Sequence, residues 1–257
     1  RCLVGSEMCI RDSPLPASPS HTLPGPPRTC YAPPPMSTDP VTFLETTFPA
    51  IFDKAVAQLR DKSAAGDAKA QKLLDDCTSV VGAAVIVLDG SGTVFLTARD
   101  GKITSSREKP AGVPMRIAVG CEADALEVAL GEAVNEGALD DPRVLEHAPH
   151  LASKRLEELL KERKMTCHVF VKDHPDLGDV TIRLGFNVEE PPEKPGFTAE
   201  MKFADLESMR SGDIDMQKMM MNGKLRLKGD YSVALQIGMQ LAQEAQMAAR
   251  AAAAKKA

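Results

Sequence analysis

The sequence contains no tryptophan and only two tyrosines, and aromatic residues make up 4% of its 257 residues. Proteins that bind single-stranded nucleic acid usually stack the bases on aromatic rings and attract the phosphates with a basic surface. The net charge of −5 gives no such basic excess, so nucleic acid is excluded as an expected partner. Long uninterrupted apolar runs are missing as well, and we therefore do not expect a transmembrane protein.

The cysteines form neither a metal-binding nor a disulfide pattern. Cys77, Cys121 and Cys167 are scattered, and no CxxC pair occurs anywhere in the chain. His147 and His150 are close in sequence, but Pro149 separates them and no third ligand lies nearby. We expect no metal and no cofactor, and a reducing cytoplasmic compartment is the simplest interpretation. The remaining polar residues contain no acid, base and nucleophile set, which argues against an enzyme.

The first 35 residues differ in composition from the rest, since they hold nine of the 19 prolines. Residues 3–13 resemble a translated sequencing adapter, and residues 14–35 show no apolar periodicity. We expect residues 1–35 to be an artefactual or disordered leader and Met36 to be the native start, the alternative being a genuine Pro-rich tail.

Residues 36–164 are expected to form an N-terminal half of helices around a hairpin. Apolar residues at spacings of three and four predict a helix over 41–60. Valine-rich runs separated by a Gly-rich turn predict paired strands over 80–88 and 93–98. A third strand over 115–119 and helices over 123–134 and 151–164 follow.

Residues 165–245 repeat this order, with expected strands over 167–171, 180–186 and 197–203 and helices from 205 onward. Aligning the two series gives offsets of 84 and 83 residues, which suggests a diverged tandem duplication. The last segment, 246–257, is Ala-rich and is expected to be a helical tail.

The segment 197–241 is rich in methionine. Met216, Met219 and Met220 share one face of a predicted helix, and Met209 lies seven residues before the first of them. Asp213 or Asp215 is expected to cap that helix, and Asn222-Gly223 to end it. Methionine is flexible and packs against apolar shapes of varied outline. The stripe therefore indicates either an adaptable apolar cavity or an ordinary core.

A strictly alternating stretch follows this helix. Leu225 and Leu227 point to one side of an expected strand, and Lys224, Arg226 and Lys228 point to the other. The cations would meet either solvent at an edge strand or an anionic group.

This segment resembles the end of a sterol carrier protein type-two domain, the nonspecific lipid-transfer family. The resemblance rests on Asp205-Leu206, Gly212, Asp215, Met220-Met221, Gly223-Lys224-Leu225 and Gly229-Asp230. It implies an α+β fold in which helices cover one face of a five-stranded sheet. An apolar tunnel between them would hold a fatty acyl chain, fatty acyl-CoA, phospholipid or sterol.

By this resemblance the chain is a non-catalytic lipid-binding or lipid-transfer protein that touches membrane surfaces transiently. The expected lining residues are apolar side chains of the last third of the chain: Phe203, Leu206, Met209, Met216, Met219, Met220, Leu225, Leu227 and Ile237. The alternative is a dimerisation or accessory module whose groove is filled by a helix, such as the tail. The oligomeric state is left open.

Overall fold

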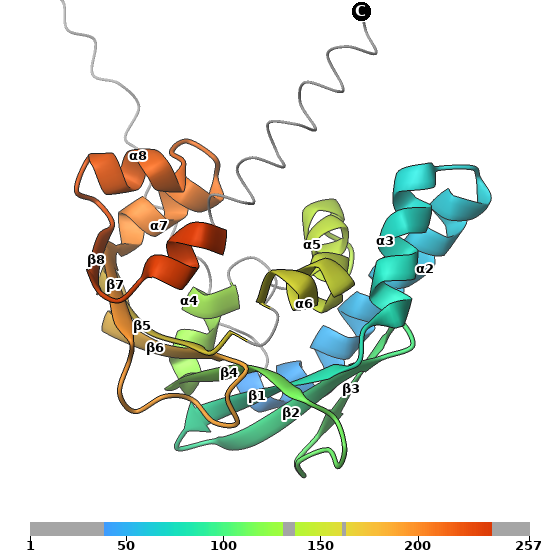
Figure 1. The fold of residues 1–257 in the computed structure, drawn as a ribbon, viewed down its shortest axis with the longest axis horizontal. Coiled ribbons are helices and arrows are strands. Elements are labelled where there is room, and N and C mark those ends of the chain that lie inside the picture. The colour runs from blue at the N-terminus through green and yellow to red at the C-terminus, as the bar shows by residue number, and fades with distance from the viewer. Residues whose placement is uncertain (1–38, 131–136, 161–162, 238–257) are drawn as a thin grey trace, which may run out of the picture. The chain divides into compact units, whose positions relative to one another are not determined.

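The computed structural model of the chain describes residues 39–130, 137–160 and 163–237 (Figure 1). The predicted leader 1–35 and the tail 246–257 lie outside these residues. In chain order, the described elements are α1 (Pro40–Thr42), the π-helical turn η1 (Phe43–Thr47), α2 (Phe48–Ala64), α3 (Ala68–Ser79), β1 (Gly82–Asp89), β2 (Gly92–Arg99), β3 (Lys102–Ser106), β4 (Met115–Glu122), the 3-10 turn η2 (Ala123–Ala125), α4 (Leu126–Leu130), α5 (Pro142–His147), the 3-10 turn η4 (Ala148–Ala152), α6 (Lys154–Leu160), β5 (Met165–His174), β6 (Gly178–Phe186), β7 (Phe197–Lys202), α7 (Phe203–Arg210), α8 (Met216–Met221) and β8 (Arg226–Gly229). Residues 232–237 are helical.

The first helix begins at Asp39, whose carboxylate accepts the amide of Thr42 at 2.9 Å, and Pro40 occupies its first turn. Thr47, which precedes α2, makes no capping bond with its side chain. Instead the helix runs on through η1, where the amide of Phe48 bonds to the carbonyl of Phe43. Pro49 accounts for this irregular turn, since its ring nitrogen cannot donate to the carbonyl four residues earlier.

The eight strands of the described residues form one sheet in the order β3-β2-β1-β4-β6-β5-β7-β8. The predicted sheet of five strands is therefore wrong. The additional pairing joins β4 to β6, where Ile117–Gly120 lie antiparallel to Arg183–Phe186. An unpaired strand edge leaves amides and carbonyls without partners, and this pairing satisfies both the free edge of β4 and that of the β5–β6 hairpin.

The strand order repeats within the sheet. In β2-β1-β4 and again in β6-β5-β7, a hairpin is antiparallel and a later strand lies parallel to the hairpin's first strand; β3 comes between in the first set, and no strand does in the second. Val85 lies opposite Ala118, and Val169 lies opposite Ala199. The repeat agrees with the tandem duplication, which stays a prediction.

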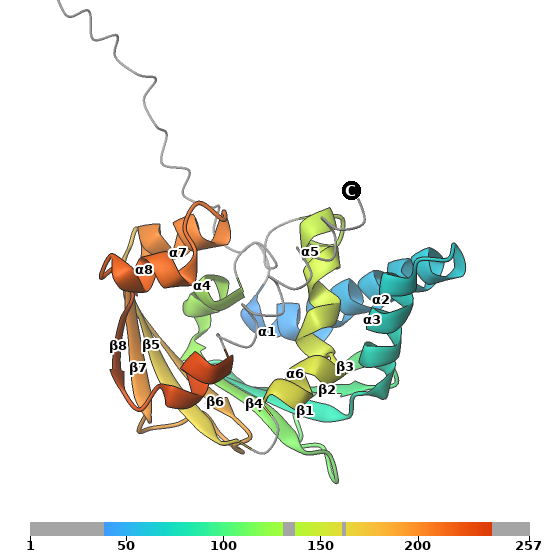
Figure 2. The ribbon, with the colours of Figure 1, turned by 45° about the horizontal axis from the view of Figure 1, so that its top comes forward.

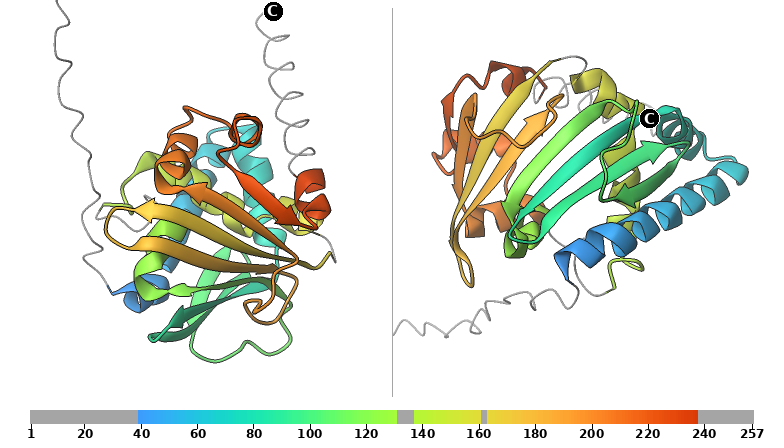
Figure 3. Two further views of the ribbon diagram at one scale, coloured as in Figure 1. Left: turned by 90° about the vertical axis from the view of Figure 1, so that its left-hand side faces the viewer. Right: turned by 90° about the horizontal axis from the view of Figure 1, so that it is seen from below.

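The helices gather on one face of the sheet, as Figure 2 shows. Over β1–β4, α2 and its neighbours seal a large apolar core, in which Phe43, Leu44, Ile51, Phe52 and Val56 are 0–2% exposed. The other face is seen in the right-hand view of Figure 3, where loops rather than helices cross the strands. One of these loops brings Pro191 and Pro192 against glycines of β4 and β6.

Candidate functional site

The methionine-rich segment folds largely as its sequence predicts. Asp215 caps α8, because its carboxylate accepts the amide of Lys218 at 2.7 Å, and this bond lowers the pKa of the Asp215 carboxyl. The helix ends at Asn222, and Gly223 follows with a φ of +67° that favours glycine. Leu225 is buried and Leu227 half-buried, while Lys224, Arg226 and Lys228 are exposed, so the predicted alternation is confirmed.

Helix α8 and the residues on either side of it lie over the last strands of the sheet and pack against a second apolar cluster. Its buried residues come from neighbouring strands and from the methionine segment: Cys167, Phe197, Ala199, Met201, Met219 and Leu225. We call this group the C-terminal apolar cluster. In-register pairing of β5 with β7 and of β7 with β8 places the strand members on one face of the sheet. Met219 is fully buried, with 0% exposure.

Six of the nine predicted lining residues meet at this cluster. Met219 and Leu225 belong to its buried part. Leu206, Met209, Met220 and Leu227 pack against it and are only half-buried. The structure thus brings most of the predicted side chains together, although lipid contact by each of them stays a prediction.

Three predicted residues lie elsewhere. Phe203 packs against the large core, and its ring lies 4.3 Å from that of His174 between centroids. Met216 is 55% exposed on α8. Ile237 is half-buried at the end of the described residues and is not among the side chains that pack on the C-terminal apolar cluster.

The structure adds apolar residues that the sequence did not single out. Met165, Val169 and Leu184 of β5 and β6 pack against the cluster, as do Ile214 and Tyr231. Val169 and Leu184 also contact the large core, so the two apolar groups meet on the sheet. Alternating apolar residues in 165–171 and 180–186 were a usable signal for a buried face, but only the strand order shows what that face adjoins.

The two apolar groups differ in how completely they are closed. Over the N-terminal strands, α2 alone buries Ile51, Phe52, Ala55 and Val56. Over the C-terminal strands, α7 buries none of its side chains and α8 buries only Met219. The apolar residues that rim the C-terminal apolar cluster therefore remain partly accessible, which a packed protein interior normally avoids.

Lys224 forms the principal polar contact at the rim of this cluster. Its Nζ lies 2.7 Å from Oδ1 of Asp205, and the Asp205 side chain is only 15% exposed. The pair joins the two halves of the sequence motif, since Asp205 is in the first turn of α7 and Lys224 follows α8. Arg226 lies 3.8 Å from Glu200 across the β7–β8 pair, so this cation faces a carboxylate of the protein.

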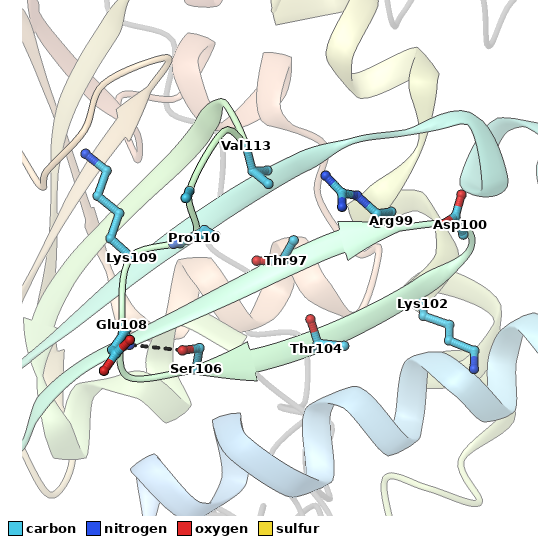
Figure 4. A pocket seen from close by; sticks show the side chains of 11 residues that line it. Thr97, Arg99, Asp100, Lys102, Thr104, Ser106, Glu108, Lys109, Pro110 and Val113 are labelled. Atoms are coloured by element: carbon cyan, nitrogen blue, oxygen red, sulfur yellow. Dashed lines mark hydrogen bonds between the residues drawn. The ribbon is translucent and has the colours of Figure 1, made fainter.

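A hollow of about 700 Å³ lies far along the sheet from this cluster, on the β2–β3 hairpin and the loop after it. Figure 4 shows Thr97 and Thr104 side by side on its floor, with Arg99 and Lys102 pointing in different directions. Hydroxyls and charges of both signs line most of it, including Asp100. Such a surface does not favour an acyl chain or sterol.

The remaining polar groups offer little reactivity. Burial raises the pKa of the thiols of Cys77, Cys121 and Cys167 to about 11, so each is protonated near neutral pH. His174 is buried, and its Nδ1 accepts the amides of Asp176 and Leu177 at 3.2 Å, which gives it a structural task in the β5–β6 turn. Within the described residues, no cluster of three acidic, cysteine or histidine side chains could hold a metal ion, and no helix is long and apolar enough to cross a membrane.

Comparison with protein families bears on the half of the chain that carries this cluster. Residues 145–242 match the SCP-2 sterol transfer family. This segment, which we call the SCP-2 segment, contains α6 to β8 and with them the whole C-terminal apolar cluster. The resemblance inferred from the motif is therefore confirmed for this part of the chain. The match covers less than half of the 257 residues.

Two solved structures were also compared. The sterol carrier protein domain 2 of Helicoverpa armigera is 20% identical, with 39% of this chain and 82% of that chain covered and a TM-score of 0.29. The sterol carrier protein 2 from Yarrowia lipolytica, in its apo form, is 17% identical, with 38% and 83% covered and a TM-score of 0.26. A comparison with curated protein sequences gives no match.

Proposed function

We propose that this chain binds a lipid at the C-terminal apolar cluster and carries it between membranes without catalysing a reaction. The single observation behind this proposal is the half-buried apolar rim of that cluster, formed by Leu206, Met209, Met220 and Leu227 within the SCP-2 segment. Apolar side chains that are gathered but not sealed gain free energy when another apolar group covers them.

The ligand class follows from the same side chains. Each buried methylene of an acyl chain contributes about 0.8 kcal/mol without requiring a directed contact. Flexible methionines adapt to chains and rings of different outline. Fatty acids, fatty acyl-CoA, phospholipids and sterols are therefore all candidate ligands, and we expect weak discrimination among them.

Native mass spectrometry of the purified full chain tests this proposal first. A mass increment that disappears after delipidation, with the lipid identified in the extract, supports the proposal. The same spectrum gives the number of subunits, and a lipid-free dimer with no uptake of added fatty acid would instead favour the accessory or dimerisation module.

A pair of neighbouring methionines provides a matched binding test. Met220 is half-buried at the rim of the cluster, whereas Met221 is 78% exposed on the same helix. We expect Met220→Glu to weaken binding of a fluorescent fatty acid at least tenfold, because a carboxylate at the rim must be desolvated. Met221→Glu should leave the affinity unchanged. Equal affinities in both variants would exclude this cluster as the site.

A further inference from the structure

We propose that α7 is a lid over the C-terminal apolar cluster and that the ion pair between Asp205 and Lys224 is the latch that keeps it closed. This inference rests on the proposed function, since it describes how a lipid would enter and leave the same site.

The packing of α7 is weak for a helix in this fold. It contributes Leu206 and Met209 to the rim of the cluster, but none of its eight residues is buried. A helix that buries little apolar surface opens locally at low cost, because few contacts are lost. By contrast, α2 buries four residues in the large core and is expected to stay closed.

The ends of α7 allow it to move as a unit. It follows directly on β7, and after it Gly212 adopts a φ of +82° with open space where a side chain would begin. Glycine at this point gives the chain backbone freedom that other residues lack. Phe203, the first residue of α7, is held against His174 of β5, so the part of the segment that can swing without disturbing the sheet begins after it.

A polar contact at each end of α7 holds the helix in its closed position. At its far end, Arg210 donates to the carbonyl of Val128 in α4. At its near end, Asp205 is paired with Lys224, which directly precedes the buried Leu225. The carboxylate of Asp205 is largely buried, and Nζ of Lys224 lies 2.7 Å from its Oδ1. Replacing Lys224 by a neutral residue therefore leaves a poorly hydrated negative charge on α7. The pair thus links the lid to the segment between α8 and β8.

Amide hydrogen exchange of the full chain, without lipid, tests the latch. We expect Lys224→Gln to increase exchange of residues 203–210 about two- to fivefold, a range set by the usual strength of accessible ion pairs. Exchange of Ile51 to Val56 in α2 should not change. The exchanged pair Asp205→Lys with Lys224→Asp should restore protection, and Lys218→Gln serves as the control because its partner Asp215 lies within the same helix turn.

The rate of lipid entry tests whether the lid controls access to the C-terminal apolar cluster. Stopped-flow mixing with a fluorescent fatty acid should show association about two- to fivefold faster for Lys224→Gln than for the control. Unchanged exchange in residues 203–210 and an unchanged association rate would overturn the lid. Faster exchange combined with no binding by any form, the wild type included, would contradict the proposed function while leaving the latch in place. Circular dichroism confirms that each variant is folded.

Discussion

The hydroxyl of Ser105 in β3 donates a hydrogen bond of 2.8 Å to the backbone carbonyl of Glu45 in η1. In a regular α-helix that carbonyl would accept the amide of residue 49, but residue 49 is a proline and has no amide hydrogen. The edge strand thus supplies the donor that the helix lacks. The bond ties the N-terminal helix to the sheet over which it builds the large core.

Replacing Ser105 by alanine should lower the free energy of unfolding by about 1–3 kcal/mol, because the Glu45 carbonyl then loses its partner in a half-buried place. Urea denaturation measures this change. In the double variant with Pro49→Ala, the restored amide can donate to Glu45, so the cost of Ser105→Ala should largely disappear. An equal loss of stability in both backgrounds would contradict the compensation.

Met219 and Met221 lie two residues apart on α8 and differ completely in exposure, at 0% and 78%. Met219→Ala should reduce the free energy of unfolding by about 2–4 kcal/mol, since it removes a buried side chain and leaves a cavity. Met221→Ala should change it by less than about 0.5 kcal/mol, as is usual for surface positions. Similar losses from the two substitutions in thermal or urea denaturation would show that α8 does not lie over the sheet in this way.

The buried thiols predict a loss of stability at high pH. Burial raises the pKa of the Cys121 thiol to about 11, whereas an unfolded cysteine ionises near about 8.5. The stabilising contribution of the neutral thiol is therefore complete below about pH 8.5 and is lost as the pH rises from there toward 11. Urea midpoints at pH 7.5 and pH 10 measure this loss. It should be smaller in Cys121→Ala, and an identical loss in that variant would contradict a buried neutral thiol.

The sequence predicted individual elements better than their assembly. Apolar periodicity located α2 and the strands β1, β2, β4, β5, β6 and β7 to within a few residues, because each buries one face or both. It missed β3, where Ile103 is the only large apolar residue in Lys102–Ser106. It also missed α5, which begins at Pro142 after an Asp141 cap. Both are short elements whose stability comes from their neighbours.

At the candidate site, the features that depend on neighbouring residues could be predicted from the sequence, and those that depend on pairing between distant segments could not. The cap of α8, expected at Asp213 or Asp215 and found at Asp215, the end at Asn222 and the alternation around Leu225 depend on neighbouring residues, and they were predicted. The pairing of β4 with β6 depends on two free strand edges meeting, which no local pattern encodes. The edge-to-face contact of Phe203 with His174 has the same character, and it places Phe203 against the large core.

The face of the sheet without helices is covered at Gly185 by a close-fitting loop. A Cβ atom placed on Gly185 of β6 would collide with the side chain of Val188 and lie 3.5 Å from the Cβ of Ala118 in β4. Since Ala118 is 0% exposed, there is no free space into which the added methyl could move. Gly185→Ala should therefore lower the free energy of unfolding by about 1–3 kcal/mol, the usual cost of overpacking. Val188→Ala in the same chain should recover part of that loss, which urea denaturation would show, whereas no recovery would mean that the strain arises elsewhere on β6.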